Sequence, residues 1–146
     1  MINIDESALN QGDLRYKKWR VRGDSNSVKE RSITPRLSVI AAVSTEGECY
    51  MSIGQANTDS NTFCLFMQKL ILRLHQERPD FRETTIFQLD SADYHCSKVT
   101  RNFIANNGLQ VTLGGVYGYR LAACEMLFAG IKSVNLNPQY EATGKR

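Results

Sequence analysis

Two short apolar runs separated by a helical pattern constrain the fold of this 146-residue chain more than any other feature. The first run is "TTIFQLD" at residues 84–90 and the second is "LQVTL" at residues 109–113, and both have the composition of β-strands. The segment between them, "SKVTRNFIANNG", predicts a short helix closed by Asn107-Gly108. Because a strand, a helix and a strand in this order form a crossover unit, we expect the two strands to be parallel.

The N-terminal half predicts antiparallel strands instead. "RLSVIAAVS" and "ECYMSIG" are rich in β-formers and are separated by Thr45-Glu46-Gly47, which is typical of a hairpin. "MINI" predicts a short strand that ends at Asp5. Residues 6–36 show no periodicity and are expected to form a long loop.

Two further segments predict helices that pack on this sheet. In "NTDSNTFCLFMQKLILRLHQERP", Asp59 or Ser60 is expected to cap the helix, and Pro79 lies just past its end. Its apolar residues form one stripe at helical spacing: Phe63, Phe66, Met67, Leu70 and Leu74. A final helix is expected over "YRLAACEMLFAGIKS", with the apolar set Leu121, Cys124, Leu127, Phe128 and Ile131.

The predicted fold class is therefore α/β, with a mixed five-stranded sheet and helices packed on it. Three strands form an antiparallel meander and the last two are parallel. The run at residues 84–90 is almost continuously apolar, so we expect it to be a central strand covered on both faces.

Composition excludes several classes of protein. No apolar run approaches the roughly 18 residues of a membrane span. The start "MINIDESALN" has neither the basic region nor the apolar core of a secretion signal, so we expect the protein not to be secreted. The four cysteines lack zinc-site spacing and are expected to be reduced thiols of a cytosolic or nuclear protein.

One segment concentrates positive charge. Between Leu14 and Arg36 there are eight Lys/Arg and only two acids, although the net charge of the whole chain is +3. Clustered basic and aromatic side chains suit phosphate contacts and base stacking. The candidate DNA-binding residues are Arg15, Lys17, Lys18, Trp19, Arg20 and Arg22. The alternative is a solvated loop that keeps the protein soluble.

Three acids form a candidate metal site. Asp5 and Asp90 are each expected at the end of a strand, and the strand order makes those two strands neighbours about 4.8 Å apart. Two carboxylates at that distance repel each other unless a divalent cation such as Mg²⁺ lies between them. Glu125 is the only acid of the final helix and is expected to point toward the sheet. Taken singly, Asp5 and Asp90 are more often ordinary turn acids.

The segments around these acids resemble the three acidic motifs of mariner-type DDE transposases. They are "INIDES", "FQLDSADYH" and "CEMLFAGIK", with 34 residues between Asp90 and Glu125, a spacing typical of one branch of that family. Ser91 stands where the family has Asn, and "GGVYGYRLAAC" replaces the family's Asn-Pro stretch before the third acid. The resemblance extends from about Ile2 to Lys132.

The resemblance implies a ribonuclease H-like catalytic domain over residues 1–134, with a basic arm-like insertion at about 12–36 and a polar tail at 135–146. It implies that Asp5, Asp90 and Glu125 are the catalytic ligands of two Mg²⁺ or Mn²⁺ ions. His95 would lie near the site and support its geometry. The implied activity is cleavage at transposon ends and joining to target DNA by a homodimer, in the nucleus of a eukaryote or otherwise in the cytoplasm.

Two alternatives remain open at this point. The chain would be a catalytically inactive or truncated transposase-derived protein if it binds DNA without cutting it. It would be another ribonuclease H-like hydrolase if its substrate is an RNA–DNA hybrid or a junction.

Overall fold

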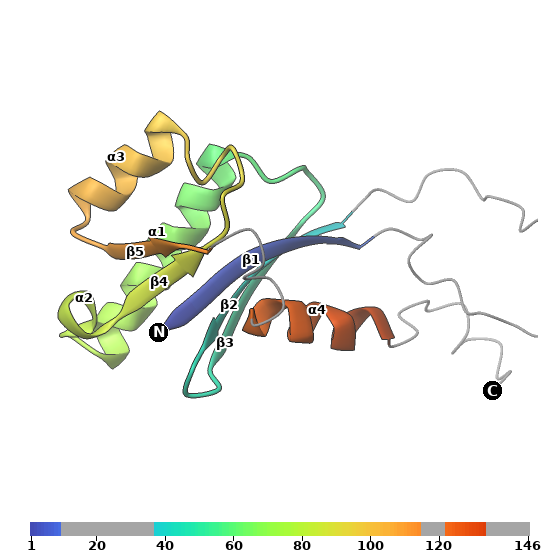
Figure 1. Ribbon diagram of the computed structural model, residues 1–146, viewed down its shortest axis with the longest axis horizontal. Coiled ribbons are helices and arrows are strands. Elements are labelled where there is room, and N and C mark those ends of the chain that lie inside the picture. The colour runs from blue at the N-terminus through green and yellow to red at the C-terminus, as the bar shows by residue number, and fades with distance from the viewer. Residues whose placement is uncertain (10–36, 115–121, 134–146) are drawn as a thin grey trace, which may run out of the picture.

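The computed structural model describes residues 1–9, 37–114 and 122–133, and its core is a five-stranded sheet with the order β3-β2-β1-β4-β5 (Figure 1). The strands are β1 (Ile2–Leu9), β2 (Leu37–Ser44), β3 (Cys49–Gly54), β4 (Ile86–Leu89) and β5 (Gln110–Leu113). The helices are α1 (Ser60–Glu77), α2 (Phe81–Thr84), α3 (Lys98–Asn106) and α4 (Ala123–Ser133). The short helix α2 was not predicted from the sequence.

The predicted mixed sheet is confirmed. β1 pairs antiparallel with β2, and β2 pairs antiparallel with β3. β4 pairs parallel with both β1 and β5. The hairpin turn contains Gly47 at φ 89°, a backbone conformation that glycine adopts without steric cost.

The first strand is longer than expected. β1 continues past Asp5 to Leu9, and the pairs from Glu6–Ile40 to Leu9–Leu37 extend its ladder with β2. The predictions that the strand ends at Asp5 and that the loop begins at residue 6 are therefore wrong. Asp, Glu and Ser are poor β-formers, but pairing with the apolar strand β2 satisfies their backbone groups and outweighs that preference.

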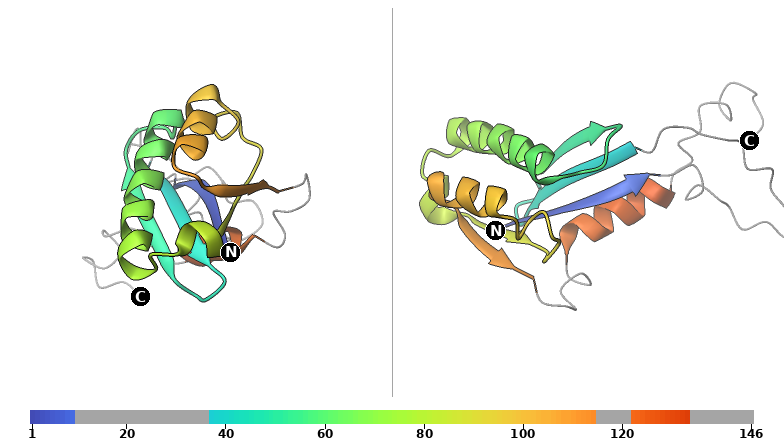
Figure 2. Two further views of the ribbon diagram at one scale, coloured as in Figure 1. Left: turned by 90° about the vertical axis from the view of Figure 1, so that its left-hand side faces the viewer. Right: turned by 90° about the horizontal axis from the view of Figure 1, so that it is seen from above.

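Helices cover both faces of the sheet. α1 and α3 lie against one face and α4 against the other, as the views from the side and from above show (Figure 2). The expected stripe of α1 is buried in the larger core, and Asp59 caps that helix by accepting a hydrogen bond from the Thr62 N–H at 2.7 Å. A smaller core under α4 contains Val39, Ala41, Cys124 and Phe128.

The expectation that β4 is covered on both faces is wrong. Phe87 and Leu89 are buried, whereas Ile86 is 45% exposed. This alternation arises because α4 packs on β1 and β2, so the α4 side of β4 keeps its access to solvent.

Three segments lie outside the described residues: 10–36, 115–121 and 134–146. The expected basic insertion and the expected polar tail fall within them. In the part of the chain that the structure describes, no helix combines the length and the apolar character that crossing a membrane requires.

Candidate active site

Two carboxylates are aligned across neighbouring strands near the centre of the sheet. β1 and β4 are parallel neighbours, with Ile2 paired to Phe87 and Asn3 paired to Gln88. Asp5 and Asp90 each come two residues later on their own chain segment, so the register aligns them. The predicted adjacency of the two strands is thus confirmed.

The third acid is carried by α4, which is attached directly to β1. The Cys124 N–H donates a hydrogen bond of 3.0 Å to Asn3 Oδ1, and both residues are buried. Asn3 and Asp5 share one face of β1 because side chains alternate along a strand. α4 therefore begins beside Asp5, and Glu125 lies in its first turn.

Glu125 is exposed, which corrects the expectation that it points away from bulk water. Its position on α4 follows Cys124, whose side chain is the one directed into the sheet. The negative charge of Glu125 nevertheless acts on Asp5, because it raises the pKa of that carboxyl group.

Ionisation of the Asp5 carboxyl group is unfavourable in the folded protein. Burial raises the pKa of Asp5 to about 6, although the Glu6 N–H, which donates to Asp5 Oδ1 at 2.8 Å, acts in the opposite direction. The charges of Glu6, Asp90 and Glu125 also contribute to this raised pKa. A cation near Asp5 would relieve both the burial cost and the repulsion.

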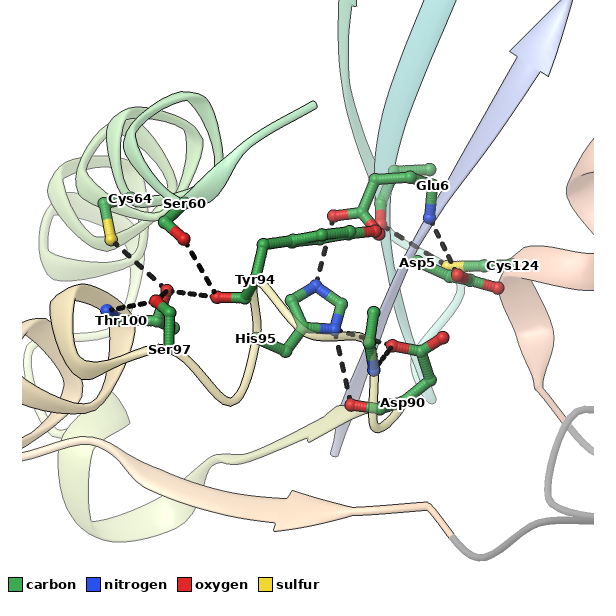
Figure 3. Close-up of polar contacts among 12 residues, drawn as sticks. Asp5, Glu6, Ser60, Cys64, Asp90, Tyr94, His95, Ser97, Thr100 and Cys124 are labelled. Atoms are coloured by element: carbon green, nitrogen blue, oxygen red, sulfur yellow. Dashed lines mark hydrogen bonds and ion pairs between the residues drawn. The ribbon is translucent and has the colours of Figure 1, made fainter. Parts of the chain in front are cut away.

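The segment after β4 orients Asp90. Asp90 Oδ1 accepts hydrogen bonds from the Ala92 N–H at 3.0 Å and from His95 Nδ1 at 2.7 Å. The carbonyl oxygen of Tyr94 accepts from the Thr100 hydroxyl at 2.6 Å, and this bond fixes the segment to α3. Figure 3 shows the contact between Asp90 and His95 and the contact between Tyr94 and Thr100.

His95 is fully enclosed between two carboxylates. Its ring packs 4.4 Å from the Phe63 ring and 4.5 Å from the Tyr94 ring, centroid to centroid. Nε2 lies 3.2 Å from Glu6 Oε1, opposite the Nδ1 contact with Asp90. Burial alone lowers the pKa of His95, but hydrogen bonds to the negative charges of Glu6 and Asp90 outweigh it and raise the pKa.

Glu6 is a site residue that sequence reasoning missed. Side chains alternate along a strand, so Glu6 faces away from Asp5 and is not a candidate metal ligand. On that opposite face, Glu6 Oε2 accepts a hydrogen bond from the Tyr94 hydroxyl at 2.7 Å (Figure 3). Burial and the neighbouring Glu6 charge raise the pKa of Tyr94, so the hydroxyl remains a donor. No local pattern places Glu6 beside residues so far along the chain.

The donor set suits a hard divalent cation, because Asp5, Asp90 and Glu125 offer only carboxylate oxygens. Within the described residues, Oδ2 of Asp5 and Oδ2 of Asp90 have no hydrogen-bond partner. The same residues contain no group of three or more His, Cys, Asp or Glu spaced closely enough to hold a metal ion. The chemistry of the donors therefore fits a metal, although the three acids are not gathered around one point.

Asp93, which lies three residues past Asp90, is exposed and makes no hydrogen bond with another described residue. The candidate DNA-binding residues Arg15, Lys17, Lys18, Trp19, Arg20 and Arg22 all lie outside the described residues.

Comparison with known proteins gives one family and one group of structures. The family model described as DDE superfamily endonuclease matches residues 1–140. No curated protein matches the sequence. The fold is similar to that in the Mos1 mariner paired-end complex with Mn, with a TM-score of 0.68 and 17% identity over 89% of this chain and 40% of that chain.

Two further structures have the same fold. The catalytic domain of Mos1 mariner transposase matches with a TM-score of 0.67 and 16% identity over 99% of this chain and 65% of that chain. The Mos1 strand transfer complex matches with a TM-score of 0.63 and 16% identity over 90% of this chain and 40% of that chain. This chain thus spans about two fifths of the chains in the two DNA complexes. The predicted ribonuclease H-like mixed sheet is confirmed.

Proposed function

Because this chain belongs to the DDE superfamily endonuclease family, which confirms the predicted resemblance, we propose that it performs metal-dependent DNA strand cleavage and strand transfer. The observation that carries the proposal is the alignment of Asp5 on β1 with Asp90, just past the end of the parallel neighbour β4, with α4 attached to β1 beside Asp5. Residues 1–134 would form the catalytic domain.

In this proposal Asp5, Asp90 and Glu125 hold Mg²⁺ or Mn²⁺. The bound ions would polarise the scissile phosphate and lower the pKa of the attacking water or 3′-hydroxyl. Asp90 presents a carboxylate whose orientation is set by Ala92 and His95. Asp5 contributes a partly buried charge that an arriving cation stabilises.

The substrates we propose are transposon ends and target DNA, bound by a homodimer. The Mos1 paired-end complexes with Mn, with Mg and with the left transposon end support this choice by similarity of fold. In a eukaryotic host, the nucleus is the compartment where such DNA is available. The basic residues between Arg15 and Arg22 would contact phosphates, which makes the binding sensitive to salt.

The decisive experiment compares Asp90→Asn with Asp93→Asn in a nicking assay on supercoiled DNA containing Mg²⁺ or Mn²⁺. Asp93 is a matched control, since it is an exposed aspartate three positions along the same segment. We expect Asp90→Asn to lose nicking by more than about a hundredfold, in line with the loss of a catalytic charge-stabilising group. Asp93→Asn is expected to retain it, and circular dichroism would show that both variants are folded.

Equal nicking by Asp90→Asn and the wild type would refute the proposal. Salt-dependent DNA binding without nicking by the wild type would instead favour the binding-only alternative. Preference for an RNA–DNA hybrid or a junction over linear duplex would favour the other ribonuclease H-like alternative.

A further inference from the structure

Three side chains form a continuous contact from β1 to the proposed site. Glu6 Oε1 lies 3.2 Å from His95 Nε2, and His95 Nδ1 lies 2.7 Å from Asp90 Oδ1. Residues at the two ends of this contact are 84 positions apart in the sequence. Figure 3 shows the imidazole between the two carboxylates. The arrangement thus joins a buried acid to an acid that faces solvent.

The burial of Glu6 is not explained by packing alone. Its side chain is only 9% exposed, and both of its oxygens accept hydrogen bonds from site-facing residues. A buried carboxylate costs free energy unless its partners compensate, and an apolar residue of similar size often stabilises a core as well or better. Glu6 is therefore better explained by what it does to His95 than by what it adds to the core.

Asp90 differs from Glu6 in its exposure to solvent, because its side chain is 59% exposed. An exposed carboxylate samples several orientations unless hydrogen bonds select one. Here Oδ1 accepts from Ala92 and His95, whereas Oδ2 has no hydrogen-bond partner within the described residues. The contacts thus fix one oxygen and leave the other directed outward for a ligand.

His95 can hold Asp90 only if its ring is itself oriented. An imidazole rotated by half a turn would present carbon rather than Nδ1 to Asp90. Glu6 selects the observed orientation by binding Nε2, and the Tyr94 hydroxyl in turn holds the second oxygen of Glu6 at 2.7 Å. Loss of a hydrogen bond behind a metal ligand typically weakens metal affinity by about 10- to 100-fold.

We propose that Glu6 is a positioning residue, which acts through His95 to hold the Asp90 carboxylate in the orientation that binds the divalent cation. This inference rests on the proposed function, since it assigns Asp90 as a ligand. Glu6 does not replace Asp5 as a ligand, because neighbouring residues of a strand face opposite sides of the sheet.

The test is a Mn²⁺ titration of the full chain by isothermal titration calorimetry, with two substitutions that both remove the charge. Glu6→Met keeps the side-chain volume but cannot bind His95. Glu6→Gln replaces the carboxylate with an amide, which still hydrogen-bonds to Nε2. We expect Mn²⁺ to bind Glu6→Met about tenfold or more weakly than the wild type, and Glu6→Gln to recover most of that loss.

A matched control is available at the C-terminal end of α1, the opposite end from Ser60, which contacts Tyr94. Glu77 accepts a hydrogen bond from the Tyr50 hydroxyl at 2.8 Å, just as Glu6 accepts one from Tyr94, but it lies away from Asp90. Glu77→Met is expected to leave Mn²⁺ affinity unchanged. Circular dichroism melts would establish that every variant is folded at the titration temperature.

The two proposals fail in different ways. If Asp90→Asn binds Mn²⁺ as the wild type does, the proposed function is overturned, and this inference with it. If Asp90→Asn loses binding while Glu6→Met keeps wild-type affinity, only the role of Glu6 is overturned. Weak binding by both Glu6→Met and Glu6→Gln would also overturn it, because charge and not His95 orientation would then be the cause.

One further measurement uses the wild-type protein alone, so its result does not depend on whether a variant folds. ¹⁵N chemical shifts of the His95 ring in the wild-type protein report whether each nitrogen is hydrogen-bonded. The inference requires that both nitrogens are engaged, and a ring with an unbonded Nε2 would overturn it.

Discussion

At the residue scale, the adjacent acids Asp5 and Glu6 differ in how their charge is compensated. Glu6 is nearly enclosed but has two hydrogen-bond donors, Tyr94 and His95. Asp5 has one backbone donor and three neighbouring negative charges. On one face of β1, the Glu6 carboxylate is compensated by hydrogen-bond donors. On the other face, the Asp5 carboxylate is partly buried next to like charges.

The pKa of Asp5 predicts how stability depends on pH in the absence of metal. Its folded value of about 6 exceeds its ordinary value of 3.8, so the folded state binds the proton more tightly than the unfolded state. This contribution to stability is present below about pH 4 and is lost as pH rises through 6. Asp5→Asn should therefore raise the free energy of unfolding at pH 8 by about 1 kcal/mol after allowance for solvent screening.

Thermal unfolding in EDTA at pH 8 and at pH 4 would measure this difference. The gain from Asp5→Asn is expected to shrink toward zero at pH 4, where the wild-type carboxyl is already protonated. Asp93→Asn is the control, because that side chain is exposed and is not among the charges that raise the pKa of Asp5. A gain of equal size at both pH values would contradict the assigned pKa.

At the element scale, a buried amide of β1 helps to hold α4 on the sheet, in addition to the small core beneath that helix. Asn3 is on the central strand, and its Oδ1 accepts the N–H of Cys124 in the first turn of α4. Backbone N–H groups in the first turn of a helix have no partner within the helix, so a side chain must supply one. Asn3 does so from a different element, which ties the helix that carries Glu125 to the strand that carries Asp5.

Asn3→Ala should therefore destabilise the fold by about 1–3 kcal/mol, because it leaves a buried N–H unpaired. Urea unfolding followed by circular dichroism would measure the loss. Asn102→Ala is the matched control, since Asn102 is exposed on α3 and should change stability by less than about 0.5 kcal/mol. If both variants unfold at the same urea concentration, the Asn3–Cys124 hydrogen bond does not contribute as argued.

At the scale of the whole molecule, metal binding and folding should be linked. An ion that binds only the folded chain raises its apparent stability, by about 2.7 kcal/mol when the ion is at a hundred times its dissociation constant. Mn²⁺ should therefore raise the melting temperature of the wild type, and EDTA should reverse the change. Asp90→Asn should show no such rise, whereas a rise equal to that of the wild type would mean that Mn²⁺ binds elsewhere.

Much of this fold could be predicted from the sequence because its signals are local. The stripe from Phe63 to Leu74, the turn at Gly47 and the helix end at Asn107-Gly108 all follow from spacing and glycine chemistry. The length of β1 could not, because Glu6–Leu9 are strand residues only through their pairing with β2. The exposure of Ile86 likewise depends on where α4 packs, which no local pattern records.

The candidate site was predictable in part for the same reason. Asp90 follows a clear strand, and the strand order placed Asp5 next to it. The contact of Glu6 with His95 joins distant segments, and its neighbour Asp5 faces the other way, so alternation argued against including it. Glu125 was expected to face inward, but Cys124 occupies that direction.

The hydrogen bond between Asn3 and Cys124 also has a consequence for protein synthesis, since it joins residues 121 positions apart. The ribosome makes β1 before α4, so β1 cannot form its contact with α4 until the residues between them have been synthesised. A nascent chain interrupted between Asp90 and α4 would carry Asp5 and Asp90 but not Glu125. If these acids cut DNA together, a translation product that stops before Glu125 would lack one of the three, because α4 is made after both acid-bearing strand segments.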